Sequence, residues 1–156
     1  MKSTYQNLAD RIKKLTVFCI EHSANCFAEF QPHNLFKYCA FNLLNGNLFA
    51  VWENGEVQMI AFAWRANAGE LLRRDAAKEP QFDWRPEQPN GDALLIGQIT
   101  GNRKLSGEII KQVMAQWPES PRLRVFIYRK RNGAAVMKEV NWKILQRFCH
   151  EQPKHT

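Results

Sequence analysis

The fold is decided by residues 94–128, which read LLIGQITGNRKLSGEIIKQVMAQWPESPRLRVFIY. The pieces at 94–99 and 123–128 are short apolar runs of the kind that form buried strands. Between them, apolar residues from Ile109 to Trp117 recur every three or four positions on one helical face, and Pro118 stops that helix. A strand–helix–strand crossover of this kind is nearly always right-handed, with its two strands parallel.

The joint between the first strand and the helix carries an unusual set of residues. It holds Gly101 and Gly107, the cations Arg103 and Lys104, and Ser106 in a position to cap the helix. The amino end of a helix offers unpaired backbone amides and the positive end of a dipole. The sequence therefore predicts an anion-binding site at this joint.

The chain before the crossover predicts two helices and a hairpin. A helix is expected over residues 4–22, and a second over 35–44 with Asn34 as its N-cap and Asn45-Gly46 at its end. Two β-rich runs, 48–52 and 57–64, then flank Asn54-Gly55. This dipeptide between such runs is the strongest short signal for a β-hairpin.

The remaining segments complete the predicted order. Residues 68–79 predict a charged helix, and the proline-rich stretch 81–91 predicts an irregular loop. After the crossover, Asn132 is predicted to cap a short helix through Val140, followed by a last strand over 143–148 and a polar tail from about 149. The order is helix, helix, hairpin, loop, strand, helix, strand, helix, strand, which is an α/β domain.

Composition sets the broad class of protein. At 156 residues we expect one domain, residues 1–156. No window is apolar enough for a membrane span and the N-terminus lacks a signal-peptide layout, so a cytoplasmic location is expected. The four cysteines show no Cys-x-x-Cys spacing, so we expect buried thiols and neither disulfides nor a metal site. The net charge of +7 favours polyanionic partners or phosphate-bearing ligands.

The element order and the anion-binding joint resemble the GNAT acyltransferase fold. In that family the loop after the central strand follows Arg/Gln-x-x-Gly-x-Gly/Ala and wraps the pyrophosphate of acetyl-coenzyme A. Here Lys104 supplies a cation, Gly107 the first glycine, and Ile109 stands at the second small position. Asn132 and Ala135 echo a later Asn and small-residue pattern of the family. The resemblance implies transfer of an acyl group from acetyl-CoA or another acyl-CoA to an amine. It also implies a cofactor site made of Gln98, Ile99, Thr100, Arg103, Lys104, Ser106, Gly107 and Asn132.

A second resemblance is to the RTX toxin-activating lysine acyltransferases. Several pieces follow in the order seen in those proteins: residues 62–66 (FAWRA), a charged helix, Asp83-Trp84, Gly91-Asp92 and an apolar strand. Those enzymes take a fatty acyl group from acyl carrier protein, using a histidine near the first helices and an aspartate in the central strand. In this chain His22 and His33 lie near the first helices, and Gly97 and Gln98 occupy the region of the strand aspartate.

The chemistry of acyl transfer sets the requirements for catalytic residues. The amine must be deprotonated, a base or ordered water must take its proton, and hydrogen-bond donors must stabilise the oxyanion. Backbone amides around residues 98–100, beside a bulge typical of the family's central strand, are candidates for the donors. The candidate catalytic side chains are His33, Asp92 and Tyr128. Asp92 has loop capping as its alternative role, and Tyr128 would either protonate the leaving thiolate or pack as a half-buried sheet tyrosine.

A concentrated basic surface supports a different class of function. We expect Arg129, Lys130 and Arg131 to gather with Arg103 and Lys104 at one end of the crossover, and Arg122 and Arg124 to join them there. Such a surface would neutralise the phosphates of coenzyme A. On a non-catalytic protein of the same fold it would bind nucleic acid or an acidic protein, or it would simply be solvated. The acceptor, the acyl chain length and the oligomeric state stay open.

Overall fold

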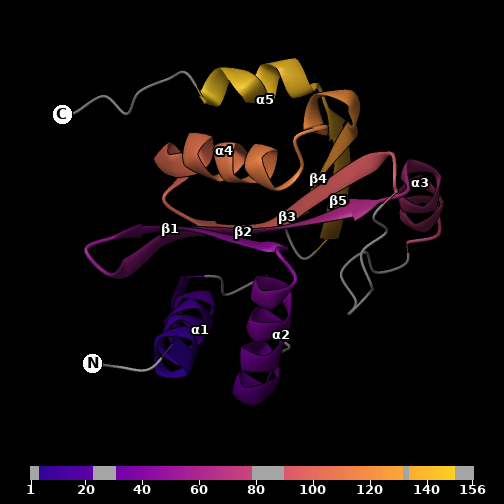
Figure 1. Cartoon of the computed structure of the whole chain (residues 1–156). Coiled ribbons are helices and arrows are strands. Elements are labelled where there is room, and N and C mark those ends of the chain that lie inside the picture. The colour runs from indigo at the N-terminus through magenta and orange to yellow at the C-terminus, as the bar shows by residue number, and fades with distance from the viewer. Residues whose placement is uncertain (1–3, 23–30, 79–89, 132–133, 150–156) are drawn as a thin grey trace.

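The structure of the chain, a computed structural model, describes residues 4–22, 31–78, 90–131 and 134–149. One five-stranded sheet runs through them in the order β1-β2-β3-β4-β5. Helices α1 (Thr4–His22) and α2 (Pro32–Leu44) cover one face, and α4 (Ser106–Gln116) and α5 (Trp142–Phe148) cover the other (Figure 1). This mixed α/β sheet, with a helix pair, a hairpin and a central crossover, is the architecture that the sequence predicts.

The two N-terminal helices pack together on β1 (Leu48–Glu53) and β2 (Glu56–Ala66). Helix α1 has the predicted bounds, but α2 begins at Pro32 and not at Leu35. Gln31 occupies its N-cap without a side-chain bond, so the predicted cap at Asn34 is wrong. Proline suits the first turn of a helix because its missing N–H would be unsatisfied there anyway. Gly46 ends the helix with a φ of 75°, as predicted.

The predicted hairpin is confirmed. Strands β1 and β2 pair antiparallel, and Glu53 faces Glu56 across Asn54 and Gly55. Both turn residues have positive φ, 51° and 76°, which is the geometry of a type I′ turn.

The crossover is also confirmed. Strand β3 (Ala93–Gly101) leads through the 3₁₀ turn η1 (Arg103–Leu105) and α4 to η2 (Ser120–Arg122), and then to β4 (Arg124–Arg131). Strands β3 and β4 are parallel, and β2 pairs antiparallel with β3. The apolar face of α4 packs on the sheet through Ile109, Ile110, Val113 and Trp117.

The last two elements are the reverse of the prediction. Residues Ala134–Val140 form strand β5, which pairs antiparallel with β4, and Trp142–Phe148 form helix α5. The predicted Asn132-capped helix and the predicted strand over 143–148 are therefore wrong. Residues 134–140 form a strand and not a helix because pairing with β4 satisfies their backbone hydrogen bonds and their helical periodicity is weak. The second segment is a helix because Asn141 caps it, accepting a bond from the Lys143 amide at 2.8 Å, and because Trp142 and Leu145 pack beside α4.

The middle segment and the thiols complete the description. Helix α3 (Ala68–Ala76) is shorter than predicted, and the predicted loop 81–91 lies outside the described residues except at its end. Cys19 and Cys39 are buried thiols that form no disulfide, and a hydrogen bond with Cys19 lowers the pKa of Cys39. Among the described residues, no helix has both the length and the apolar character needed to cross a membrane.

Candidate functional site

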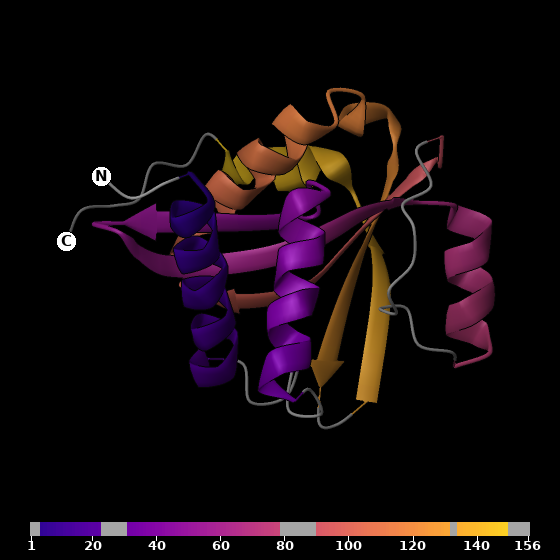
Figure 2. The same cartoon turned by 60° about the horizontal axis from the view of Figure 1, so that its bottom comes forward.

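The sheet opens between its two parallel strands. Pairing of β3 with β4 runs from Ala93 and Arg124 to Gly97 and Tyr128, and there it ends. Beyond that point β3 continues to Gly101 beside β2, while β4 continues to Arg131 beside β5. Figure 2 shows β4 and β5, in orange and yellow, leaving the direction of the other three strands. We call the opening between residues 98–101 and 129–131 the notch.

A bulge in β3 lies at the start of the notch. Ile60 of β2 pairs with Thr100, whereas Phe62 pairs with Gly97, so two steps on β2 match three on β3. Gln98 takes up the extra residue with a φ of 51°, a left-handed conformation that is costly for a residue with a Cβ atom. Bulges and strained residues of this kind concentrate at functional sites.

The bulge and the notch together leave one edge of β3 without a neighbouring strand at residues 98–101. Neighbouring amides along a strand point to opposite edges, and β2 occupies only one edge of residues 98–101. The amides and carbonyls on the other edge face the space that β4 has left. An unpaired strand edge can bind an extended ligand, and free backbone amides can stabilise a developing oxyanion.

The joint after β3 differs from the prediction in one respect. The 3₁₀ turn η1 runs directly into α4, so the merged helix starts at Arg103. The Asn102 side chain caps it, accepting from the Lys104 amide at 3.1 Å. Ser106 does not cap α4, because its hydroxyl donates to the Arg103 carbonyl oxygen at 2.7 Å. The amino end of the helix thus lies one turn earlier than expected, with Arg103 and Lys104 exposed beside it.

Close packing fixes the end of β3 in place. Gly101 has a φ of 108°, and a Cβ atom on it would lie 2.4 Å from the Gln58 carbonyl oxygen. The Asn102 amide donates to that same oxygen at 2.9 Å. On the α1 side, the buried Thr100 hydroxyl donates to the His22 carbonyl oxygen at 3.0 Å. The strand end is therefore tied to both β2 and the last residue of α1.

A cavity adjoins this strand end on the α1 face. Its volume is about 510 Å³ and its lining is Phe18, His22, Val57, Gln58, Gly101 and Asn102. A larger groove of about 940 Å³ runs along α1 and the hairpin, and it shares Phe18, His22 and Val57 with the cavity. Gly101 lines this cavity, and the same residue belongs to the stretch of β3 that borders the notch.

Comparison with known proteins adds little to this geometry. No protein-family model matches the sequence, and none of the curated proteins matches it. Among solved structures, the chain is similar to "GphF GNAT-like decarboxylase in complex with isobutyryl-CoA". The two share 13% identity over 80% of this chain and 64% of that chain, with a TM-score of 0.46. A likeness at this level carries no argument about activity, which rests on the site itself.

The three candidate catalytic residues lie in different places. Tyr128 is half-buried at the last paired position of β4, where the notch begins. Asp92 lies at the opposite end of β3, and its carboxylate accepts from the Ala68 amide at 2.8 Å. Its capping role is thus the one that the structure shows. His33 is exposed in the first turn of α2, five residues before Tyr38 or about 7.5 Å along the helix axis.

The predicted cofactor residues follow β3 and the joint. Gln98 and Thr100 are buried at the bulge, and Ile99 packs toward α4. Gly107 is half-buried in the first turn of α4. Asn132 lies outside the described residues.

The expected single basic surface is wrong. Arg124 lies beside Ala93 at the amino end of the parallel pair, and the five pairs from there to Gly97 already span about 13 Å. Arg124 also donates to both carboxylate oxygens of Glu139, at 2.8 and 2.9 Å, and these bonds lower the pKa of Glu139. Arg103, Lys104 and Arg129 belong to the other end, which holds the notch. Arg124 and Arg131 are close in sequence, but they are the first and last residues of β4 and therefore lie at opposite ends of it.

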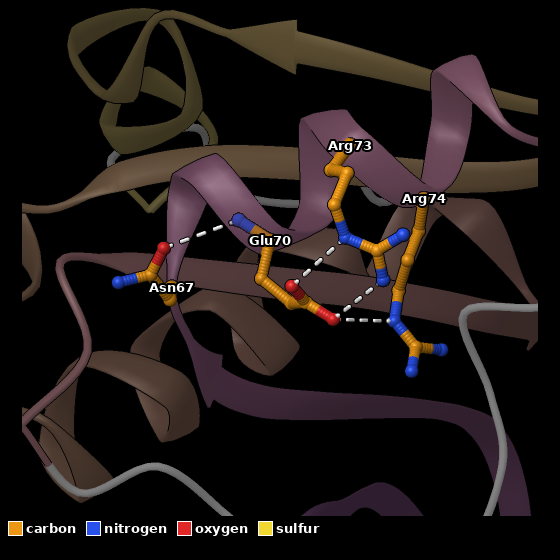
Figure 3. A network of polar contacts seen from close by, with 4 residues as sticks. All are labelled: Asn67, Glu70, Arg73 and Arg74. Carbon is orange, nitrogen blue, oxygen red and sulfur yellow. Dashed lines mark hydrogen bonds and ion pairs between the residues drawn. The ribbon is translucent and has the colours of Figure 1, made fainter.

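A second charged network belongs to α3 and to the amino end of β3. Asn67 caps the helix by accepting from the Glu70 amide at 3.1 Å, and the Glu70 carboxylate accepts from Arg73 and Arg74 (Figure 3). Hydrogen bonds from Arg73 and then Arg74 lower the pKa of Glu70 to about 2. These charges support a surface helix, and because Ala66 pairs with Ala93 they lie at the end of β3 away from the notch.

Sequence reasoning missed the partner of the bulge. The Tyr38 hydroxyl on α2 donates to the Gln98 side-chain oxygen at 2.7 Å, and both residues are buried. They are 60 positions apart in the chain. Nothing in the sequence pairs them, since a buried helical tyrosine reads as an ordinary core residue.

Proposed function

We propose that this chain transfers an acyl group from coenzyme A or an acyl carrier to an amine acceptor. The observation that carries the proposal is the separation of β3 from β4 immediately beyond the bulge. A phosphopantetheine arm is narrow, extended and rich in amides. It would lie between residues 98–101 of β3 and 129–131 of β4 as an added strand does.

The phosphate end of the donor would lie at the joint after β3. Arg103 and Lys104 are exposed there beside the amino end of the merged helix. A phosphate gains both the helix dipole and charge-assisted hydrogen bonds at such a place. Ser106 and Gly107 follow in the next turn, and we include them in the phosphate site together with Asn132.

The reaction would take place at the bulge. The amine nitrogen attacks the thioester carbonyl carbon, and amides around Gln98, Ile99 and Thr100 donate to the oxyanion that forms. As the intermediate collapses, the new C–N bond stays and the C–S bond breaks. Tyr128, where the notch begins, would protonate the leaving thiolate. The acceptor would enter through the cavity beside His22, and its own proton would pass to water there.

One observation favours a non-catalytic protein of the same fold. Asp92, a candidate base, is engaged in capping α3 at the far end of β3. A chain without a base would still present Arg103, Lys104 and Arg129 at the notch. Their polyanionic ligand would then be nucleic acid or an acidic protein.

Calorimetry with acetyl-CoA separates these functions, run in parallel with a nucleic-acid gel shift at two salt concentrations. We expect saturable binding of acetyl-CoA, and Lys104→Ala should weaken it by about 1.5–3 kcal/mol through loss of a charge-assisted contact. Lys37→Ala, on the exposed side of α2, is the matched control and should leave affinity unchanged. Absence of binding to any CoA ester, with salt-dependent binding of nucleic acid, would establish the second function in place of the first.

A further inference from the structure

A network of buried hydrogen bonds connects α2 to the bulge of β3. Tyr38 and Gln98 are 1% and 8% exposed, and the bond between hydroxyl and side-chain oxygen is 2.7 Å. The Tyr38 ring also stacks on Phe62, with ring centroids 5.2 Å apart. The hydroxyl is thus held by a ring that has little freedom to move.

The hydrogen-bonded network continues along the same face of α2. Asn42, one turn after Tyr38, donates from its side-chain nitrogen to the Tyr38 carbonyl oxygen at 2.9 Å. Its side-chain oxygen accepts from the Trp64 indole N–H at 3.0 Å. The Trp64 ring stacks on Phe62, the same residue that stacks on Tyr38, and the centroids of the Trp64 and Phe62 rings are 5.8 Å apart. Two strands are therefore anchored to one turn of α2, β2 through Trp64 and β3 through Gln98.

The bond from Tyr38 to Gln98 matters because Gln98 has an unfavourable backbone conformation. A non-glycine residue at a φ of 51° costs energy and persists only where its surroundings hold it. Glycine would adopt this conformation without strain, but it would offer no acceptor to the Tyr38 hydroxyl. Burial makes that acceptor important, since an unsatisfied buried oxygen is costly.

We infer that Tyr38 is a positioning residue for the donor site: by bonding Gln98 it holds the bulge in its left-handed turn, and so it directs those backbone amides of the bulge that face away from β2 toward the notch. Tyr38 itself need not touch the ligand. The identity of the ligand rests on the proposed function, whereas the control of the bulge by Tyr38 does not.

The test compares Tyr38→Phe with Trp64→Phe. Each variant keeps an aromatic ring and removes one donor from the same network, so each should lower thermal stability. Only Tyr38→Phe should weaken acetyl-CoA binding, by about tenfold for loss of one buried bond that aligns the site. In the ligand-free protein, only Tyr38→Phe should shift the backbone amide resonances of residues 97–100 and speed their hydrogen exchange. Equal affinities in the two variants, with unchanged resonances at 97–100, would overturn the inference.

A double-mutant cycle with Gln98→Gly keeps the test decisive. Glycine removes both the strain and the bond, so Tyr38→Phe should have no further effect on the bulge in that background. An undiminished effect would show that Tyr38 acts elsewhere and would overturn the inference. The amide readout also separates two failures. Should no CoA ester bind the intact protein while the bulge still responds to Tyr38→Phe, the proposed function fails and the control of the bulge stands.

Discussion

Replacing Gly101 with alanine tests the packing that positions the end of β3. The new Cβ atom would lie 2.4 Å from the Gln58 carbonyl oxygen, 2.8 Å from the Met59 Cα and 2.8 Å from the Phe18 Cζ. Two of these three atoms are backbone and cannot move aside alone. The φ of 108° adds strain of about 1–3 kcal/mol, and overpacking adds about 1–3 kcal/mol. The expected loss is therefore about 2–6 kcal/mol, a large part of the roughly 5–15 kcal/mol that stabilises a domain.

The matched control for Gly101→Ala is Gly46→Ala. Gly46 also has positive φ, 75°, but the Cβ atom would meet only the end of the flexible Gln116 side chain. We expect it to cost only the left-handed strain, about 1–2 kcal/mol. Urea unfolding followed by tryptophan fluorescence measures both free energies. Equal losses in the two variants would refute the claim that backbone contact at Gly101 fixes the strand end.

Three further predictions follow from the site and its surroundings. Asp92→Ala should lower the free energy of unfolding by about 1 kcal/mol, because the Ala68 amide at the start of α3 loses its acceptor, but it should leave acetyl-CoA affinity unchanged. Weakened binding of acetyl-CoA would show that Asp92 contributes to the active site. The lowered pKa of Glu70 means that its carboxylate stabilises the folded state above its ordinary value of 4.5, and that this contribution disappears as pH falls toward about 2. The stability difference between the intact protein and Glu70→Gln should shrink over that range, and a constant difference would contradict the network with Arg73. Gly107→Val should abolish acetyl-CoA binding in calorimetry while circular dichroism stays close to that of the intact protein, and unchanged affinity would remove Gly107 from the phosphate site.

Local signals predicted most of the fold. Asn54-Gly55 predicted the hairpin because these two residues alone favour the left-handed backbone conformation that the turn requires. The apolar spacing of α4 and the flanking runs placed the crossover, because one helical face and two buried strands leave a clear pattern. The last third of the chain was misassigned where such signals compete. Asn132-Gly133 is the same dipeptide, and Arg131 and Ala134 pair on either side of it, but an asparagine before an apolar segment also predicts a helix cap. The asparagine that caps a helix in this part of the chain is Asn141.

The candidate site was harder to predict than the fold. The cations and glycines of the joint are visible in the sequence, so its location at the end of β3 was predicted. The bulge at Gln98 and its bond to Tyr38 were not, because they arise from register between strands and from contact across 60 residues. The sequence alone predicts either a catalytic or a capping role for Asp92, and its bond to the Ala68 amide, which shows the capping role, is visible only in the structure.

The most direct test of the central claim is a titration of the intact, ¹⁵N-labelled protein with acetyl-CoA, followed by amide resonances. The notch account predicts saturable shifts concentrated at residues 97–104 and 128–131, with little change in α1 or α3. Lack of saturable shifts, or shifts confined to the other end of β3 around Asp92 and Arg124, would contradict it.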